Sequence, residues 1–289
     1  MTAPESSSDH RPSLAAIETG YDWNATEPYS VAAFFSLVDT LVDRYFYGFY
    51  HPLGRRMIAG ELSARELQIL AMQEYPYYAS TTWWNAGKIG NAHTLEQQRL
   101  LHGPLLDELG EDLVHESGLP AHSELFLDYC AGLGLSRAAV LGAPLAPAVV
   151  LAVTELRRIA ATRPVFEFLA VSNLVVERMR PRHYTEFLAA FRKHYTWVPA
   201  AALRFYEIHA GLDKDHESIG RRIVAQYAHT KRDQDAIFAA VLKSVVLRLA
   251  MYDGIEKMIS TPGAVGLVTW PNFPADPWPR PLTGLGETR

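Results

Sequence analysis

The feature that most restricts the fold of this chain is a helical spacing of its apolar residues over most of its 289 positions. Between Val31 and Tyr45 apolar residues recur every three or four positions, which defines one face of a helix. The same spacing continues to Ile259, with breaks at prolines and glycines. Asp253-Gly254 lies within this pattern, and no such turn joins two alternating runs. The sequence therefore predicts an all-α bundle of seven or more helices.

Local signals divide the pattern into helices. Ser63, with Glu66 three residues later, has the spacing of a capping box and predicts the start of a long helix that runs to about Asn91. Pro181 is expected to end one helix, because proline lacks the backbone donor that a helix interior needs. The remaining helices are predicted at 95–109, 123–133, 147–161, 164–180, 184–195, 199 to at least 216, and 233–259.

Composition predicts three segments. Residues 1–25 are rich in Ser, Thr, Asp and Pro and are expected to be flexible. Residues 26–260 form the helical domain. Residues 261–289 contain six prolines together with Trp270, Phe273 and Trp278, so they predict an extended tail that packs along the body or against a partner chain.

Charge and cysteine content exclude several function classes. A net charge of −5 argues against a protein that binds nucleic acid by neutralising phosphates. The single cysteine, Cys130, excludes an internal disulfide framework and thiolate-rich zinc or iron–sulfur sites, and it fits a reducing compartment. The longest uncharged stretch, 138–154, is too short and too rich in proline to span a membrane. We expect a cytoplasmic protein without membrane or nucleic-acid partners.

One short stretch carries residues suited to metal chemistry. His209, Asp213 and His216 are spaced i, i+4, i+7, so they fall on one stripe of a helix that is otherwise apolar. Imidazole and carboxylate without thiolate suit iron, manganese or zinc. In helical bundles such helices commonly hold two iron or manganese ions, with further carboxylates from other helices, for which Glu177 and Glu108 are the candidates. The alternatives are a solvated polar face and, for Glu177, a surface carboxylate.

The chain also resembles a known family through motifs between His51 and Met258. These motifs are His51-Pro-Leu-Gly-Arg-Arg-Met, Gln73-Glu-Tyr-Pro-Tyr-Tyr, Leu105-Leu-Asp-Glu108-Leu-Gly, His122-Ser-Glu-Leu-Phe, Lys193-His-Tyr-Thr-Trp-Val-Pro and the triad of His209, Asp213 and His216. The pattern is similar to the haem-oxygenase-like proteins, which include pyrroloquinoline-quinone synthase and thiaminase II. It is most similar to their diiron oxidase branch, because that branch combines the triad with upstream carboxylates and a further histidine.

The resemblance implies a haem-oxygenase-like bundle and a six-residue ligand set. Carried over position by position, the set is Glu108, His122, Glu177, His209, Asp213 and His216. The gap between Glu108 and its histidine is longer than is usual in the family, so His115 is a second candidate. His122 is preferred because the Ser-Glu-Leu-Phe that follows it matches the family's next helix.

The same resemblance implies an activity. Two Fe(II) ions, or manganese in one or both positions, would activate O2 as a co-substrate to oxidise a small amino-acid- or amine-derived substrate in a bacterial biosynthetic pathway. An external electron donor and a homodimer are also implied. Tyr206, three residues before His209, is the candidate pocket-lining or redox-active aromatic. Among the aromatic residues that crowd an earlier helix, Tyr77 and Trp84 are expected to belong to the core.

Three other interpretations compete. A cofactor-free oxidase like pyrroloquinoline-quinone synthase shares the fold and the early motifs but does not need carboxylates at both Glu177 and Asp213. A thiaminase-type hydrolase needs a nucleophilic cysteine, whereas Cys130 lies in an apolar stretch that ends in glycine. A non-catalytic interaction protein leaves the six ligand-type residues at family positions unexplained.

Overall fold

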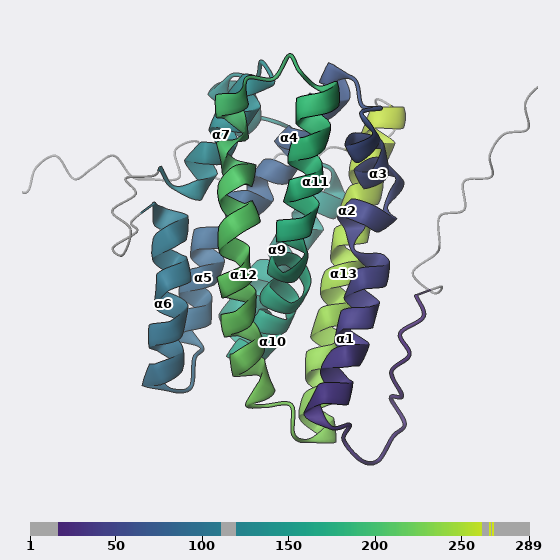
Figure 1. Cartoon of the computed structure of the whole chain (residues 1–289), viewed down its shortest axis with the longest axis vertical. Coiled ribbons are helices and arrows are strands. Elements are labelled where there is room, and N and C mark those ends of the chain that lie inside the picture. The colour runs from purple at the N-terminus through teal and green to yellow at the C-terminus, as the bar shows by residue number, and fades with distance from the viewer. Residues whose placement is uncertain (1–16, 111–119, 262–265, 267, 269–289) are drawn as a thin grey trace, which may run out of the picture.

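The structure is a computed structural model that describes residues 17–110, 120–261, 266 and 268. Within these residues the chain is an all-helical bundle (Figure 1). The α-helices are α1 (Val31–Tyr45), α2 (Tyr47–Tyr50), α3 (Pro52–Ala59), α4 (Ala64–Tyr78), α5 (Thr81–Gly90), α6 (Leu95–Leu109), α7 (His122–Gly132), α8 (Arg137–Leu141), α9 (Pro147–Thr162), α10 (Val165–Val171), α11 (Arg178–His194), α12 (Arg204–Ala225) and α13 (Lys231–Ser260). A π-helix, η2 (Ser172–Glu177), and a 3-10 helix, η3 (Ala200–Leu203), complete the set. The predicted bundle of seven or more helices is confirmed.

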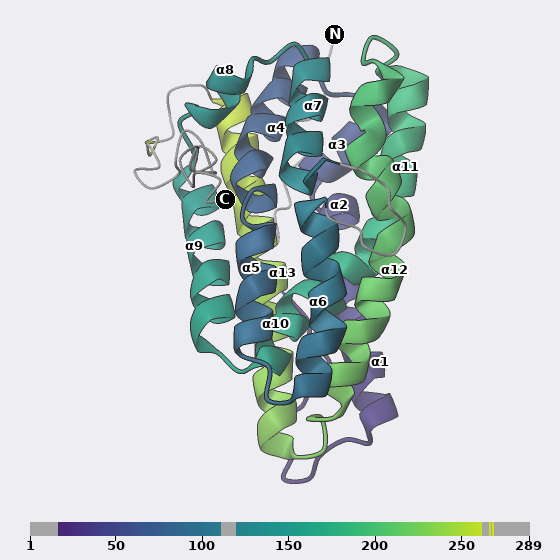
Figure 2. The ribbon, with the colours of Figure 1, turned by 90° about the vertical axis from the view of Figure 1, so that its left-hand side faces the viewer.

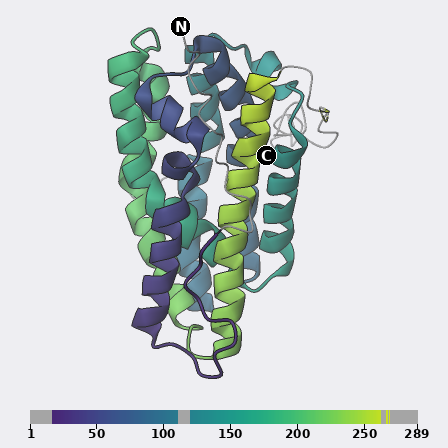
Figure 3. The same ribbon diagram turned by 90° about the vertical axis from the view of Figure 1, so that its right-hand side faces the viewer.

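Most of the long helices run along one common axis. Helices α5 and α6 pack as a pair on one side of the bundle (Figure 2), and α11 packs along α12. Helix α13 contacts α1, α9 and α10, with α1 beside it on the opposite side of the molecule (Figure 3). A continuous apolar core fills the space between them, in which Phe34, Phe126 and Phe205 are almost fully inaccessible to solvent. The site described below lies between α5, α6, α7, η2 and α12.

Several helix ends form as their local sequence predicts. The Ser63 hydroxyl accepts a hydrogen bond from the backbone N–H of Glu66, and the Glu66 carboxylate accepts one from the backbone N–H of Ser63, which completes the capping box. Helix α6 ends at Gly110, which has a left-handed φ of 77° that favours glycine. Because these signals act within one turn, sequence alone locates them.

The predicted long helix from Ser63 to about Asn91 is wrong, because it is broken between α4 and α5 at Ala79 and Ser80. The hydroxyl of Ser80 donates to the carbonyl of Pro76 at 2.8 Å, and that of Thr81 lies 2.8 Å from the carbonyl of Tyr78. These side chains satisfy carbonyls at the end of α4, so the regular hydrogen-bond pattern of the helix can be interrupted without leaving them unpaired.

The predicted helix end at Pro181 is also wrong, because Pro181 lies inside α11. Helix α10, the π-helix and α11 follow one another without a break from residue 165 to 194. A proline ring clashes with the carbonyl four residues earlier in a regular α-helix. That carbonyl belongs to Glu177, the last residue of the wider π turn, so the helix continues past the proline.

The packed part of the chain begins before residue 26. The Tyr21 ring stacks on Phe238 of α13 at 4.2 Å between centroids, and its hydroxyl donates to Asp235 at 2.8 Å. Residues 1–16 of the expected flexible segment, and nearly all of the expected tail, lie outside the described residues. Val268 is an exception, because it forms a backbone pair with Leu145.

Two further features bear on function. Cys130 on α7 is fully buried, and burial raises the pKa of its thiol to about 12, as expected for a core cysteine. In the described part of the chain, the helices are all too short or too polar to cross a membrane.

Candidate metal centre

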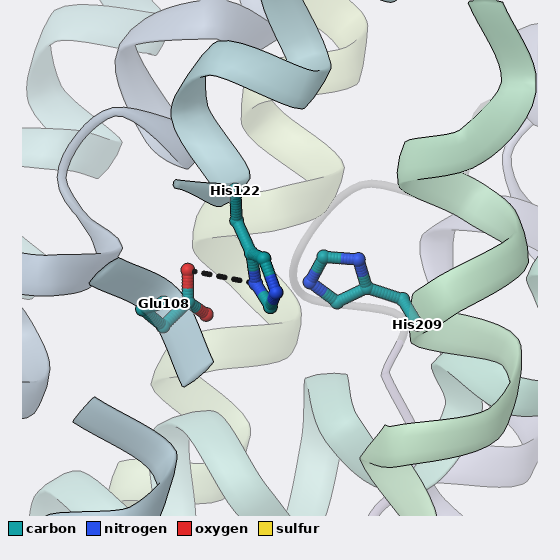
Figure 4. A group of neighbouring side chains, drawn as sticks. All are labelled: Glu108, His122 and His209. Atoms are coloured by element: carbon teal, nitrogen blue, oxygen red, sulfur yellow. Dashed lines mark ion pairs between the residues drawn. The ribbon is translucent and has the colours of Figure 1, made fainter. Parts of the chain in front are cut away.

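Three of the predicted ligands meet inside the bundle. Glu108 comes from the end of α6, His122 from the start of α7 and His209 from α12 (Figure 4). All three are buried, and one ligand atom from each lies within 4.8 Å of the other two. His122 Nδ1 is 3.2 Å from Glu108 Oε2, and the ring centroids of His122 and His209 are 4.4 Å apart. We call these three residues the EHH cluster.

The alternative histidine is not placed by the structure. His115 falls between α6 and α7, outside the described residues. His122 is the first residue of α7, where its ring points toward Glu108 and His209 (Figure 4). The histidine preferred from the sequence is therefore the one that the described part of the chain brings to the cluster.

A backbone contact fixes the orientation of the His209 ring. Nδ1 of His209 donates to the carbonyl of Phe205 at 2.8 Å, so Nε2 carries the lone pair of the neutral ring. Burial lowers the pKa of His209 well below its ordinary value, and the nearby charges of His122 and Arg180 act in the same direction. His209 is therefore neutral at physiological pH, which is the form that binds a metal.

The carboxylate of the cluster is held in its ionised form. Burial by itself raises the pKa of Glu108, but the charge and close contact of His122 outweigh it, with further contributions from His209 and Thr81. The net pKa of Glu108 lies well below its usual range. The Thr81 hydroxyl is 2.7 Å from Glu108 Oε2 and shares its one proton between this carboxylate and the carbonyl of Tyr78.

One buried atom of the cluster shows that a metal ion fits. Nδ1 of His122 is inaccessible to solvent and forms no well-defined hydrogen bond among the described residues, although it lies within ion-pair distance of Glu108. A buried nitrogen without a partner is costly. An ion bound by one carboxylate and two imidazoles would satisfy this atom, and that donor set suits iron, manganese or zinc.

Two of the other three predicted ligands, Glu177 and His216, do not join the EHH cluster. Glu177 accepts a hydrogen bond from Nδ2 of Asn173, and its Oε1 is 3.5 Å from Nζ of Lys88. Nε2 of His216 is 3.0 Å from the Asp107 carboxylate instead. The side chain of Asp213 lies outside the described residues, although its backbone belongs to α12.

Helix geometry explains why His209 and His216 separate. Seven residues advance a helix by about 10 Å, so residues on one stripe need not reach one ion. Asn173 instead ties the second group together, because its Nδ2 also donates to the backbone carbonyl of His216 at 2.7 Å. We call Glu177, Asn173 and Lys88 the EKN cluster.

A small cavity is lined by residues of both clusters. Its walls include Glu108 and Glu177, and its volume of about 20 Å³ holds one or two water molecules. One face of α5 also contributes to the wall, with the residues Thr81, Trp84, Asn85 and Lys88 spaced i, i+3, i+4 and i+7. Sequence reasoning missed Thr81 and Lys88. Their polar stripe on an otherwise aromatic and apolar segment is the signal that could have identified them.

The aromatic predictions have two outcomes. Tyr77 and Trp84 are buried, as expected for core residues, and both also line the cavity. Tyr206 stacks on Phe187 at 4.1 Å between ring centroids, and burial raises the pKa of Tyr206 well above its usual value. The cavity wall, as far as it consists of described residues, does not include Tyr206.

Comparison with known proteins places the chain in a family. A family model described as "Iron-containing redox enzyme" matches residues 68–249. A pyrroloquinoline-quinone synthase from Acidiphilium cryptum is 23% identical over 74% of this chain and 85% of that protein. A second pyrroloquinoline-quinone synthase, from Granulibacter bethesdensis, is also 23% identical, over 74% of this chain and 82% of that protein.

Solved structures share the fold. A TenA homologue from Pseudomonas syringae pv. tomato superposes with a TM-score of 0.63 at 12% identity, covering 83% of this chain and 98% of its own. A domain with a haem-oxygenase-like fold from Shewanella denitrificans gives a TM-score of 0.60 at 18% identity, covering 79% and 90%. At these identities the likeness confirms the predicted haem-oxygenase-like fold.

Proposed function

Because the chain belongs to the family of iron-containing redox enzymes, we propose that it is a non-haem iron oxidase or oxygenase that uses O2 to oxidise a small organic substrate. The observation that carries this proposal is the EHH cluster, in which a buried His122 nitrogen that forms no hydrogen bond among the described residues faces an ionised carboxylate and a neutral imidazole. The proposed role is in bacterial biosynthesis, with an amino-acid- or amine-derived substrate.

The chain's own residues prepare the centre for an ion. Glu108 supplies a charged oxygen that Thr81 orients, and His209 supplies Nε2 because Phe205 holds the other ring nitrogen. An iron ion held there would supply the redox chemistry that activates O2, with the substrate and an external donor providing the remaining electrons. The surrounding core keeps bulk water away from the three side chains, all of which are buried.

The full proposal includes a second ion. Glu177, Asp213 and His216 would hold it, with manganese possible in either position and with Tyr206 as an accessory redox-active aromatic. We also propose that the protein acts in the cytoplasm as a homodimer supplied by an external electron donor.

A cofactor-free oxidase is the second candidate, favoured by the two relatives named pyrroloquinoline-quinone synthase. The EHH cluster favours the metal enzyme over it, since a cofactor-free site does not require a buried carboxylate with two imidazoles. A hydrolase that uses a cysteine nucleophile is disfavoured, because Cys130 is fully buried and its thiol pKa of about 12 leaves almost no thiolate at neutral pH.

Metal reconstitution tests the proposal. Protein loaded anaerobically with Fe(II) and then dialysed is expected to retain iron, and O2 consumption with candidate substrates is expected to require that iron. His122→Ala should lose the iron, whereas His102→Ala, an exposed histidine on the same helix as Glu108, should keep it. Turnover that persists after chelation would favour the cofactor-free enzyme.

A further inference from the structure

A buried lysine lies beside one of the predicted ligands. The Lys88 side chain on α5 is 3% exposed, with Nζ 3.2 Å from Asn173 Oδ1 and 3.5 Å from Glu177 Oε1. We propose that Lys88 is a resident counter-cation that competes with a metal ion for Glu177 and so sets how tightly the chain binds a second ion. This inference rests on the proposed function in its two-metal form.

The charge of Glu177 is compensated by Lys88. A buried carboxylate requires a positive partner, and for Glu177 the lysine fills that role while Asn173 donates a hydrogen bond to its other oxygen. A divalent ion bound to Glu177 would face the ammonium group at close range, and like charges in a buried site repel strongly. Binding of an ion therefore requires Lys88 to leave.

The EHH cluster differs from the EKN cluster in the charges that surround its glutamate. Among the described residues, no lysine or arginine lies within ion-pair distance of Glu108. Nδ1 of His122 there forms no hydrogen bond among the described residues, whereas both oxygens of Glu177 have polar partners. An ion can enter the EHH cluster without displacing a resident cation, so the two positions should differ in affinity.

A second buried acceptor lies on the same helix as Lys88. Asn85 is one turn earlier on the cavity face of α5, where side chains three residues apart are neighbours. Its Oδ1 is buried and has no hydrogen-bond partner in the described part of the chain. The long, flexible lysine stem allows the ammonium group to turn from Glu177 to this oxygen.

Asn173 is held in place by its contacts with α12, so it does not move together with Lys88. Asn173 is anchored to α12 through the carbonyl of His216, and a Cβ at Gly220 would overlap its side chain, which shows how closely the two helices meet there. Lys88 is therefore the movable member of the EKN cluster, and Asn173 keeps Glu177 in position for whichever cation is present.

Metal stoichiometry tests the inference without any assay of activity. Wild-type protein and Lys88→Met are dialysed anaerobically against graded Fe(II), and iron per chain is measured by elemental analysis. We expect the first binding step to be unchanged and the second to tighten about tenfold or more in Lys88→Met. Lys243→Met removes a lysine of α13 that is nearly half exposed and should change neither step.

Further variants assign the effect to Glu177. Glu177→Gln should abolish the second step in the wild-type background and in Lys88→Met alike, because the neutral amide removes the charge for which both cations compete. Lys88→Arg, which keeps the positive charge, should leave the second step weak. If Lys88→Met does not fold by circular dichroism, Lys88→Gln replaces it in the same titration.

The outcomes separate this inference from the proposed function. A folded Lys88→Met or Lys88→Gln whose second step is no tighter than that of wild type, or is absent in both, overturns the inference while the proposed iron centre stands. Absence of the first step in wild-type protein overturns the proposed function and this inference with it. A second step that appears or tightens only when the charge at position 88 is removed supports the inference.

Discussion

The EHH and EKN clusters both contribute to the wall of one cavity, yet they differ in how completely their polar atoms are paired. Glu177 in the EKN cluster is held by a lysine and an asparagine from two helices. In the EHH cluster, Nδ1 of His122 is buried without a hydrogen-bond partner among the described residues. A group that lacks a partner in the metal-free chain gains most when an ion binds.

Residue type alone does not identify a metal ligand in this protein. Glu177 and Glu108 are both buried glutamates that face the same cavity. They differ in the side chain that lies within ion-pair distance, which is a lysine in one case and a histidine in the other. A histidine can exchange a proton for a metal ion and remain as a ligand, whereas a lysine has to move away.

The largest expected effect comes from removing a ligand of the EHH cluster. His209→Ala should weaken iron binding by more than about 100-fold, since even the loss of a supporting residue commonly costs 10–100-fold. The matched change His216→Ala should leave the first binding step within a few-fold of wild type. Competition with a chromogenic chelator measures both. Equal losses in the two variants would remove the distinction between the clusters.

A smaller effect is expected from crowding the EKN cluster. Gly220→Ala places a methyl group against Asn173, and overpacking of this kind costs about 1–3 kcal/mol of unfolding free energy. Gly211→Ala on the same helix meets open space and should be neutral or stabilising, because alanine favours helix. Urea unfolding of the metal-free proteins compares them. Tight iron binding at the EHH cluster should survive both changes.

The metal-free chain should lose stability as the pH falls below about 6.5. The pKa of His209 is lowered in the folded chain, so in this range the unfolded chain takes up a proton that the folded chain does not. His209 therefore contributes at most about 1.4 kcal/mol per pH unit to the slope of the unfolding free energy against pH. Glu108 contributes stability that is lost only at much lower pH, as the pH falls toward its depressed pKa. His209→Phe should flatten the profile between pH 6.5 and 5, and parallel profiles would contradict this assignment.

The smallest expected effect concerns the support of Glu108. Thr81→Val removes the hydroxyl that lies 2.7 Å from the carboxylate while keeping the side-chain shape, and should weaken iron binding about tenfold. Thr81→Ser keeps the hydroxyl and should bind nearly as well as wild type. A chelator titration can resolve this difference. A Thr81→Val protein that binds iron as tightly as Thr81→Ser would show that the hydroxyl does not support the ligand.

The sequence predicts the parts of this structure that depend on neighbouring residues in the chain. The capping box at Ser63 and the end of α6 at Gly110 form within one turn, and both occur as expected. Pro181 does not end its helix, because a π turn before it changes the local geometry, and no simple spacing rule reveals such a turn.

In the site, too, sequence predicts what depends on neighbouring residues and does not predict contacts between distant segments. The stripe of His209 and His216 follows from helix periodicity, but which ion each could reach depends on elements far away in the chain. Lys88 was not predicted because its importance arises only where α5 meets the π-helix, 85 residues later in the case of Asn173. Identity and spacing therefore indicated ligand chemistry, while the partners of each ligand required the three-dimensional structure.

The buried Cys130 provides a means to time the opening of the helix that carries His122. It is the single thiol in the sequence and lies eight residues after His122, on the same helix. A thiol reagent can modify it only when α7 separates from the core, so the modification rate reports how often that helix detaches. An ion at the EHH cluster would hold α6, α7 and α12 together. Iron should therefore slow the modification of this native thiol, and no label has to be introduced.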